Sequence, residues 1–255
     1  MRRLAILAFL LGCTPDPVVV RTPTPSLAPE PPPLPSRSVK RIRVIVALCD
    51  NENQGIVRVP AKLGNGQDPA NNLYWGAAYG VKTFFRRSSS WKSEERAKPP
   101  DPAILDHVVF RSRDFPVELI AEAYDGAKMS TAVERFFREA AGGDAELVCF
   151  VGHNGLMDRR LGTLPALARI RPKGAVVLAC KSRDYFAEPL RSVGCPPLVT
   201  TSGFMAPEAY VLDAILRTWA SGADSTAMAA DAATAYATYQ KCPPAAARKL
   251  FVAAN

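Results

Sequence analysis

The fold of this chain is decided first by the stretch Leu147-Val148-Cys149-Phe150-Val151-Gly152-His153-Asn154-Gly155, an unbroken apolar run that stops at a polar, glycine-containing turn. A second run of the same kind, Ala175-Val176-Val177-Leu178-Ala179, ends at Cys180. Short apolar runs without alternation are typical of strands that are buried on both faces of a parallel sheet. The two stretches therefore predict consecutive strands, with His153 and Cys180 at their carboxyl ends.

The rest of the chain repeats this alternation of strand and helix patterns. Further strands are expected at 42–48, 107–110, 117–123 and 198–201, and helices at 73–85, 131–141, 207–220 and 225–240. We expect Ser130 to cap the second helix and Gly142-Gly143 to end it. The segment 86–106 reads as a basic surface excursion. The pattern predicts a single α/β domain over 41–255, with a mostly parallel sheet of about six strands and helices on both faces.

Residues just past the carboxyl ends of parallel strands line the crevice where ligands bind in open α/β sheets. If the strands that end at His153 and Cys180 are neighbours, the two side chains emerge on the same edge. A cysteine thiolate can attack a carbonyl carbon while an imidazole donates a proton to the leaving group. His107 opens a strand at the opposite end, and we interpret it as structural.

The two strand-end blocks, Gly152-His153 and Ala179-Cys180-Lys181-Ser182, resemble the caspase-hemoglobinase group of cysteine peptidases, which includes caspases, legumains, gingipains and separase. The resemblance implies a three-layer caspase-like fold, with Cys180 as nucleophile and His153 as acid/base. In that family a glycine directly follows the histidine, and its backbone N–H and that of the cysteine form the oxyanion hole.

This chain departs from the family at one position, because Asn154 lies between His153 and Gly155. Three alternatives stay open at this point. Asn154 supplies the backbone N–H itself, Gly155 supplies it after a different turn, or the site is not a working peptidase.

The resemblance also implies that loops after the first strand, after the cysteine and after the last strand build the substrate pocket. The residues expected there are Asp50, Lys181, Arg183 and Ser202. Since both charge signs are present, the preferred substrate side chain stays open. Cys49 ends the first strand and is a rival nucleophile, or a partner for Cys180 in a regulatory disulfide.

No cofactor or metal is expected. None of the five cysteines after Cys13 shows zinc-ligand spacing, and His107 and His153 are the only histidines. Gly64-Asn65-Gly66 lacks the lysine and helix start of a phosphate loop, so we expect a turn there. We expect Tyr74 and Trp75 to pack in the core rather than to face the cleft at the strand ends.

The amino-terminal residues are those of a secretory signal. Arg2 and Arg3 precede the apolar run Leu4–Leu11, and Gly12 leads to Cys13. A run this short cannot span a bilayer, which needs about 20 apolar residues. Leu10-Leu11-Gly12-Cys13 resembles the lipobox of bacterial lipoproteins, which implies removal of residues 1–12 and lipid attachment to Cys13, the anchor to a membrane.

A proline-rich tether is expected to follow over residues 13–40. Residues 14–37 hold nine prolines and no hydrophobic periodicity, and 24 such residues would reach ~75 Å at about 3.1 Å each. Thr14, rather than the aspartate that retains lipoproteins in the inner membrane, favours the outer membrane. Without residues 1–12 the chain carries 30 basic and 24 acidic residues, a net charge of +6. An exported protein of this modest charge is not expected to bind nucleic acid.

These observations predict a cell-envelope cysteine peptidase or amidohydrolase that uses a His153–Cys180 dyad on a peptide or protein substrate. The alternative is a catalytically inactive caspase-like or other α/β module that binds an envelope partner. A third hypothesis, a structural spacer, predicts no cleft and a wide separation of the two side chains. The oligomeric state and the physiological role stay open.

Overall fold

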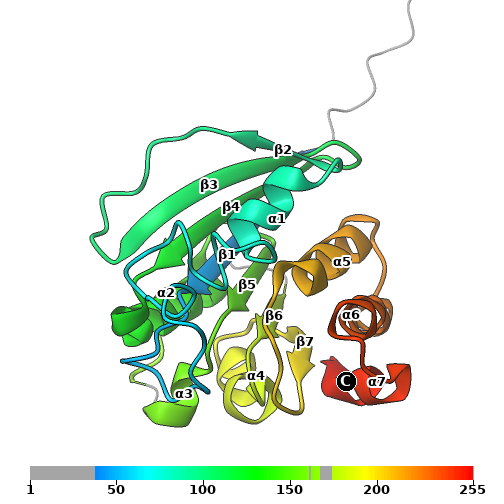
Figure 1. Cartoon of the computed structure of the whole chain (residues 1–255). Helices are drawn as coiled ribbons and strands as arrows, with labels where there is room; N and C mark the ends of the chain where they lie inside the picture. The colour runs from blue at the N-terminus through cyan, green and yellow to red at the C-terminus, as the bar shows by residue number, and fades with distance from the viewer. Residues whose placement is uncertain (1–37, 161, 167–173, 255) are drawn as a thin grey trace, which may run out of the picture. The chain divides into compact units, whose positions relative to one another are not determined.

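The computed structural model describes residues 38–160, 162–166 and 174–254 (Figure 1). The signal segment 1–12, the predicted lipidation site Cys13 and all but the last three residues of the predicted tether lie outside these described residues. Within the described part of the chain, no helix has the length and apolar character needed to cross a bilayer.

One eight-stranded sheet organises the domain, in the order β2-β3-β4-β1-β5-β6-β7-β8. Its five central strands β4, β1, β5, β6 and β7 pair in parallel, and β2, β3 and β8 add antiparallel pairings. The strands are β1 (Lys40–Ala47), β2 (Trp91–Glu94), β3 (Ile104–Ser112), β4 (Val117–Tyr124), β5 (Leu147–Val151), β6 (Ala175–Leu178), β7 (Pro197–Thr201) and β8 (Phe251–Ala253).

The predicted α/β class and mostly parallel sheet are confirmed, and the sheet has eight strands rather than about six. The two strands that the sequence did not predict, β2 and β8, are the outermost on the two sides. Both are short, with four and three residues. Neither has the apolar run that identifies a buried strand.

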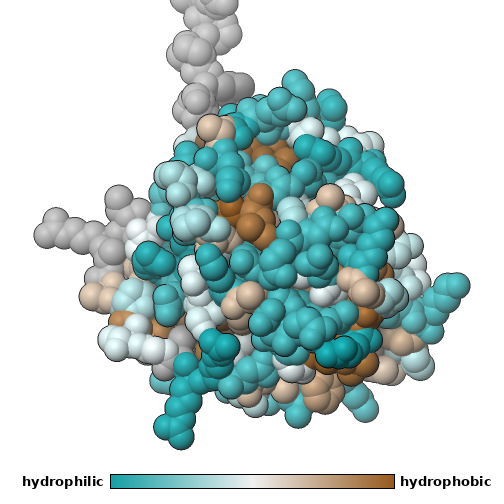
Figure 2. Space-filling model, turned by 60° about the vertical axis from the view of Figure 1, so that its left-hand side comes forward, coloured by the Kyte–Doolittle hydropathy of each residue, from teal (hydrophilic) through white to brown (hydrophobic). Residues whose placement is uncertain are grey.

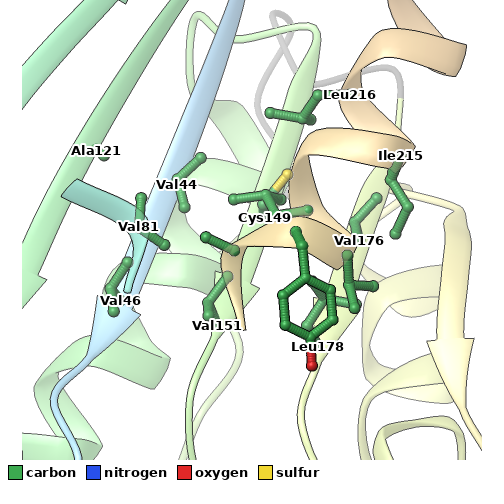
Figure 3. Packing of buried hydrophobic residues seen from close by; sticks show 14 of the residues in the cluster. Val44, Val46, Val81, Ala121, Cys149, Val151, Val176, Leu178, Ile215 and Leu216 are labelled. Carbon is green, nitrogen blue, oxygen red and sulfur yellow. The ribbon is translucent and has the colours of Figure 1, made fainter. Parts of the chain in front are cut away.

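Alternate residues of the central strands supply two separate apolar clusters. Val44 and Val46 of β1 belong to a cluster with side chains of α1 (Val81–Arg87), α5 (Ala209–Ala220) and α6 (Ser225–Gln240). Figure 3 shows part of this cluster, and Figure 1 shows α1 and α5 in front of the sheet. Ile45 and Ala47 belong to the other, with α2 (Met129–Gly142) and α4 (Ser182–Ser192). Burying such side chains contributes about 1.5–3 kcal/mol each.

The remaining helices are short: the 3₁₀ turn η1 (Gly126–Lys128), α3 (Gly155–Asp158) and α7 (Pro244–Leu250). α3 begins two residues after His153, with Asn154 as its cap. Ser130 lies inside α2, whose cap position is Lys128, so its predicted capping role is wrong.

The predicted helix 73–85 begins later, at Val81, because Asn72 organises turns before it. The Asn72 side chain accepts from the backbone N–H of Cys49 at 3.0 Å and donates to the Cys49 carbonyl at 2.8 Å. The Asn72 carbonyl in turn accepts from the N–H groups of residues 75–77. An asparagine side chain that bonds backbone groups competes with helix formation. Residues 73–80 are thereby held as turns against the end of β1.

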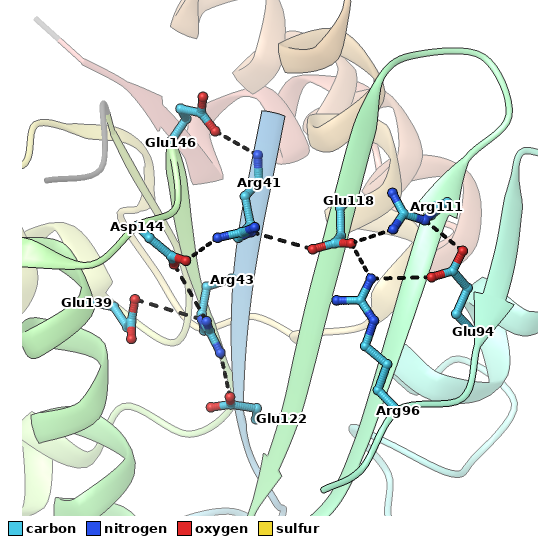
Figure 4. A network of polar contacts seen from close by, with 10 residues as sticks. All are labelled: Arg41, Arg43, Glu94, Arg96, Arg111, Glu118, Glu122, Glu139, Asp144 and Glu146. Carbon is cyan, nitrogen blue, oxygen red and sulfur yellow. Dashed lines mark hydrogen bonds and ion pairs between the residues drawn. The ribbon is translucent and has the colours of Figure 1, made fainter. Parts of the chain in front are cut away.

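A network of ion pairs extends across the β1, β4, β3 and β2 side of the sheet (Figure 4). Arg43 pairs with the buried Glu122 at 2.6 Å, and Glu118 accepts from Arg96 at 2.5 Å and contacts Arg111 at 3.1 Å. Burial disfavours the charged form of a carboxylate, but the ion pairs with these arginines compensate for it.

Figure 2 shows a mainly hydrophilic surface with small, separate hydrophobic patches on the face in view.

Candidate active site

His153 and Cys180 lie at the carboxyl ends of two neighbouring parallel strands and line the same pocket. β5 pairs with β6 from Val148 to Val151, and the Gly152 N–H continues the pairing to the Leu178 carbonyl at 3.2 Å. The pocket has a volume of about 330 Å³. The strand pattern thus brings the imidazole and the thiol to one cavity.

Gly152 shapes the turn that presents His153. Its φ is +145°, and a Cβ there would lie 2.6 Å from the Ala47 carbonyl oxygen of β1. Only glycine fits so close to a neighbouring backbone in this conformation. The chain therefore turns sharply after Val151, and His153 is 5% exposed.

Asp158 orients the imidazole, a contact that the sequence reasoning missed. Its Oδ2 lies 2.6 Å from His153 Nε2 and also accepts from the Gly55 N–H at 3.2 Å. Because Asp158 ends the short helix α3, it returns toward the histidine five residues earlier. With Nε2 bonded to a carboxylate, Nδ1 is the ring nitrogen left for proton exchange.

The Asn154 side chain joins the ends of β5 and β6. It is fully buried, donates to the Cys180 carbonyl at 2.7 Å and accepts from the Leu156 N–H at 3.1 Å, which caps α3. The Gly155 N–H donates to the His153 carbonyl at 3.1 Å and is therefore occupied. Within the described residues, no hydrogen bond uses the backbone N–H of Asn154 or of Cys180 as donor.

Cys180 lies at a tight turn between β6 and α4. Lys181, next in the chain, has φ +48°, a left-handed conformation that is uncommon for non-glycine residues. The Cys180 Sγ accepts from the Met205 N–H at 3.4 Å and lies 3.6 Å from the Met205 carbonyl oxygen. The loop after β7 therefore contacts the thiol directly.

The rival thiol, Cys49, is buried at the end of β1 and does not line this pocket. Burial raises its pKa to about 11, although a hydrogen bond with Tyr74 opposes this. A thiol with this pKa is almost fully protonated at neutral pH and is a weak nucleophile. Cys49 and Cys180 are both free thiols. Tyr74 is buried, as expected, yet it also lines the pocket.

Asp50 does not line the pocket, although its loop does. Its buried carboxylate accepts four hydrogen bonds, from the backbone of Glu52 and Asn53 and from the side chains of Asn53 and Gln67. Burial raises its pKa, but these hydrogen bonds outweigh burial and the pKa is lowered. Asp50 therefore holds the loop after β1 in shape.

The other three expected residues do not line the pocket either. The Lys181 ammonium packs over the Phe204 ring at 4.9 Å from its centroid. Arg183 lines a separate small cavity beside the strand β8. The Ser202 hydroxyl donates to the Lys249 carbonyl at 2.7 Å and ties the loop after β7 to α7.

The pocket is built instead by apolar residues of the loops after β1 and β7. The first loop supplies Ile56 and Val57, and the second supplies the residues Phe204 to Glu208. Val57 is 92% exposed and Phe204 is 69% exposed, so this pocket has large apolar side chains that are accessible to solvent. Contiguous exposed apolar groups mark binding sites more often than chance. The two loops were predicted from the resemblance, but their contributing residues were not.

The described residues contain no cluster of three or more histidine, cysteine or acidic side chains that could hold a metal ion. Comparison of this chain with protein-family models, with curated proteins and with solved structures finds no significant match.

Proposed function

We propose that this protein is a cysteine peptidase or amidohydrolase in which Cys180 is the nucleophile and His153 the acid/base. One observation carries the proposal. The thiol and the imidazole line a single pocket from the ends of adjacent parallel strands, in the order that the resemblance implies. The caspase-like, three-layer arrangement implied by the same resemblance is part of this proposal.

The proposed reaction follows from the groups around the pocket. Cys180 transfers its proton to His153 Nδ1, and the thiolate attacks the substrate carbonyl carbon. We assign the oxyanion-stabilising role to the backbone N–H groups of Asn154 and Cys180, the first of the three alternatives for Asn154, because no hydrogen bond of the described residues uses them. The C–N bond then breaks as the imidazolium protonates the leaving amine. Water hydrolyses the thioester and returns the proton to the thiol.

An electrophilic peptide probe tests the dyad. We expect an acyloxymethyl ketone peptide to label Cys180 in the full-length protein, and His153→Ala to slow labelling by about 10²–10⁴-fold. His107→Ala is the matched control, since this half-buried histidine lies on β3 away from the pocket. The proposal would be refuted if no probe labels the folded protein. It would also be refuted if His153→Ala is labelled at the native rate.

A binding module without turnover is the second candidate. It is favoured by the contacts of Met205, whose backbone N–H and carbonyl both meet the Cys180 sulfur. In this case the pocket would bind a peptide while the thiol stays inert. Peptide binding that is equal in the native protein and in Cys180→Ala, without cleavage, would support this candidate.

We also propose that the chain is held at a bacterial membrane, most simply the outer one, by lipid on Cys13. The support is the signal-like segment and the lipobox-like quartet that precede this residue. Cells fed labelled palmitate should incorporate the label into the native chain and not into Cys13→Ser. Equal incorporation in both would refute the anchor.

A further inference from the structure

Among the residues that the structure describes, Glu208 is the only acidic side chain that lines the pocket of His153 and Cys180, and no lysine or arginine lines it. The side chain is half-buried at the start of α5. Among the described residues it forms no ion pair, unlike the carboxylates of the network in Figure 4. The Lys181 ammonium packs over the ring of Phe204, another lining residue, but it does not pair with Glu208. A half-buried carboxylate without an ion-pair partner is incompletely compensated.

The hydrogen bonds of Glu208 leave one carboxylate oxygen open. Oε2 accepts from the Tyr210 hydroxyl at 2.8 Å and from Gln240 Nε2 at 2.9 Å. No hydrogen bond of the described residues reaches Oε1, and the side chain does not cap α5. Burial raises the pKa of Glu208, and the bonds from Tyr210 and Gln240 only partly offset this. A cationic ligand would supply the missing compensation.

Glu208 and Cys180 line the same pocket. The Cys180 sulfur contacts the backbone of Met205, three residues before Glu208. The Tyr236 hydroxyl accepts from the Ala206 N–H at 3.2 Å, within the loop that joins the thiol contact at Met205 to Glu208. One short loop therefore spans the distance from nucleophile to carboxylate.

We infer that this pocket binds the cationic side chain of a substrate lysine or arginine, with its head at Glu208 Oε1. The aliphatic stem would pack along Ile56, Leu73 and Met205, as such stems do on apolar surfaces. The inference rests on the proposed function and names its substrate class, peptides with a basic residue at the cleaved bond. This inference assigns the charge sign that the sequence left open: Glu208 lines the pocket, whereas Asp50, Lys181 and Arg183 do not.

Probe selectivity tests this assignment. We expect matched peptide ketones with lysine or arginine next to the ketone to label Cys180 about tenfold to a hundredfold faster than those with leucine or aspartate. Glu208→Gln keeps acceptors for Tyr210 and Gln240, so it should fold and should lose most of this preference. Glu188→Gln removes the same charge from an exposed position on α4 that does not line the pocket, and it should keep the preference.

A binding measurement separates this inference from the proposed function. Calorimetry with acetyl-arginine amide on Cys180→Ala should show binding that weakens about tenfold or more in Cys180→Ala combined with Glu208→Gln. Binding without any probe labelling would overturn the peptidase proposal and keep the cationic pocket. Labelling that depends on His153 but is equal for all probes, with no Glu208-dependent binding, would overturn the cationic pocket and keep the peptidase.

Discussion

Asp158 bonds the imidazole nitrogen that faces away from the proposed proton transfer, and this makes it a positioning residue. We expect Asp158→Asn to slow probe labelling of Cys180 by about tenfold to a hundredfold, less than the loss on removing the imidazole. An asparagine amide can bond Nε2 in either tautomer, so the fixed tautomer is lost. Imidazole ¹⁵N shifts should report this change.

A matched control for Asp158 is Asp114→Asn, an exposed residue in the turn between β3 and β4. It should change neither the labelling rate nor the ¹⁵N shifts of His153. Slower labelling with an unchanged tautomer in Asp158→Asn would mean that Asp158 acts only by holding α3 and the Gly55 loop.

Asn154 combines two tasks that substitution can separate. Asn154→Ala loses both the helix cap and the bond to the Cys180 carbonyl, so we expect the free energy of unfolding to fall by about 2–4 kcal/mol. Asn154→Asp keeps the cap for Leu156 but sets a carboxylate against a carbonyl oxygen. Urea unfolding should show the aspartate variant destabilised as well. An aspartate variant as stable as the native protein would show that the link between β5 and β6 contributes little.

Single residues at strand ends were predictable, whereas their partners were not. His153 and Cys180 follow from local apolar runs, because a strand end fixes where the next side chain emerges. Asp158 carries a weak signal, a carboxylate shortly after the histidine. Glu208 carries none, because a loop far along the chain brings it to the pocket.

At the scale of elements, the ion-pair network on β1 to β4 links sheet stability to pH. Burial raises the pKa of Glu118, but the hydrogen bond from Arg96 and the charges of Arg96, Arg111 and Arg41 outweigh it and lower the pKa. A carboxylate whose pKa is lowered by folding stabilises the fold at pH values above its pKa in the unfolded chain, which is about 4.3. That stabilisation is lost as the pH falls through the folded value.

We therefore expect the thermal unfolding midpoint to decrease as the pH drops below about 4.3. In Glu118→Gln the midpoint should decrease less steeply over the same pH range. This variant should also lose about 1–3 kcal/mol at neutral pH, because its arginine partners keep their charges without a carboxylate. Thermal melts across the pH range measure both effects. Glu188→Gln, on exposed α4, should follow the native profile. An unchanged pH profile in Glu118→Gln would show that other carboxylates govern acid unfolding.

Element types were predictable where one local signal dominates, and not where tertiary contacts decide. The apolar runs of the central strands predict them directly. The apolar side chains of residues 73–80 recur at helical spacing, but the hydrogen bonds of Asn72 hold this part of the backbone in turns. β2 and β8 are too short and too mixed in polarity to be recognised, and only pairing with β3 and β7 makes them strands.

At the scale of the whole molecule, the cysteines of the described residues fall into two classes. Cys49, Cys149 and Cys195 are buried, while Cys180 and Cys242 are partly exposed. Burial raises the pKa of Cys149 beyond any physiological pH and that of Cys49 to about 11. We expect iodoacetamide to modify Cys180 and Cys242 first in the folded protein, as peptide mass spectrometry would record. Early modification of Cys49 would contradict the packing around Tyr74.

The outermost strands of the sheet bear on how copies of this protein meet. An exposed strand edge offers unpaired backbone groups to a second chain, and the risk grows with edge length and with crowding. If the proposed anchor concentrates the protein on a membrane, long edges would invite chains to join into shared sheets and aggregate. The four residues of β2, with Lys92 and Glu94 among them, and the three of β8 are short, although β2 pairs only with the second half of β3 (Ile104–Ser112). The two outermost strands are thereby poor templates for joining one copy to another.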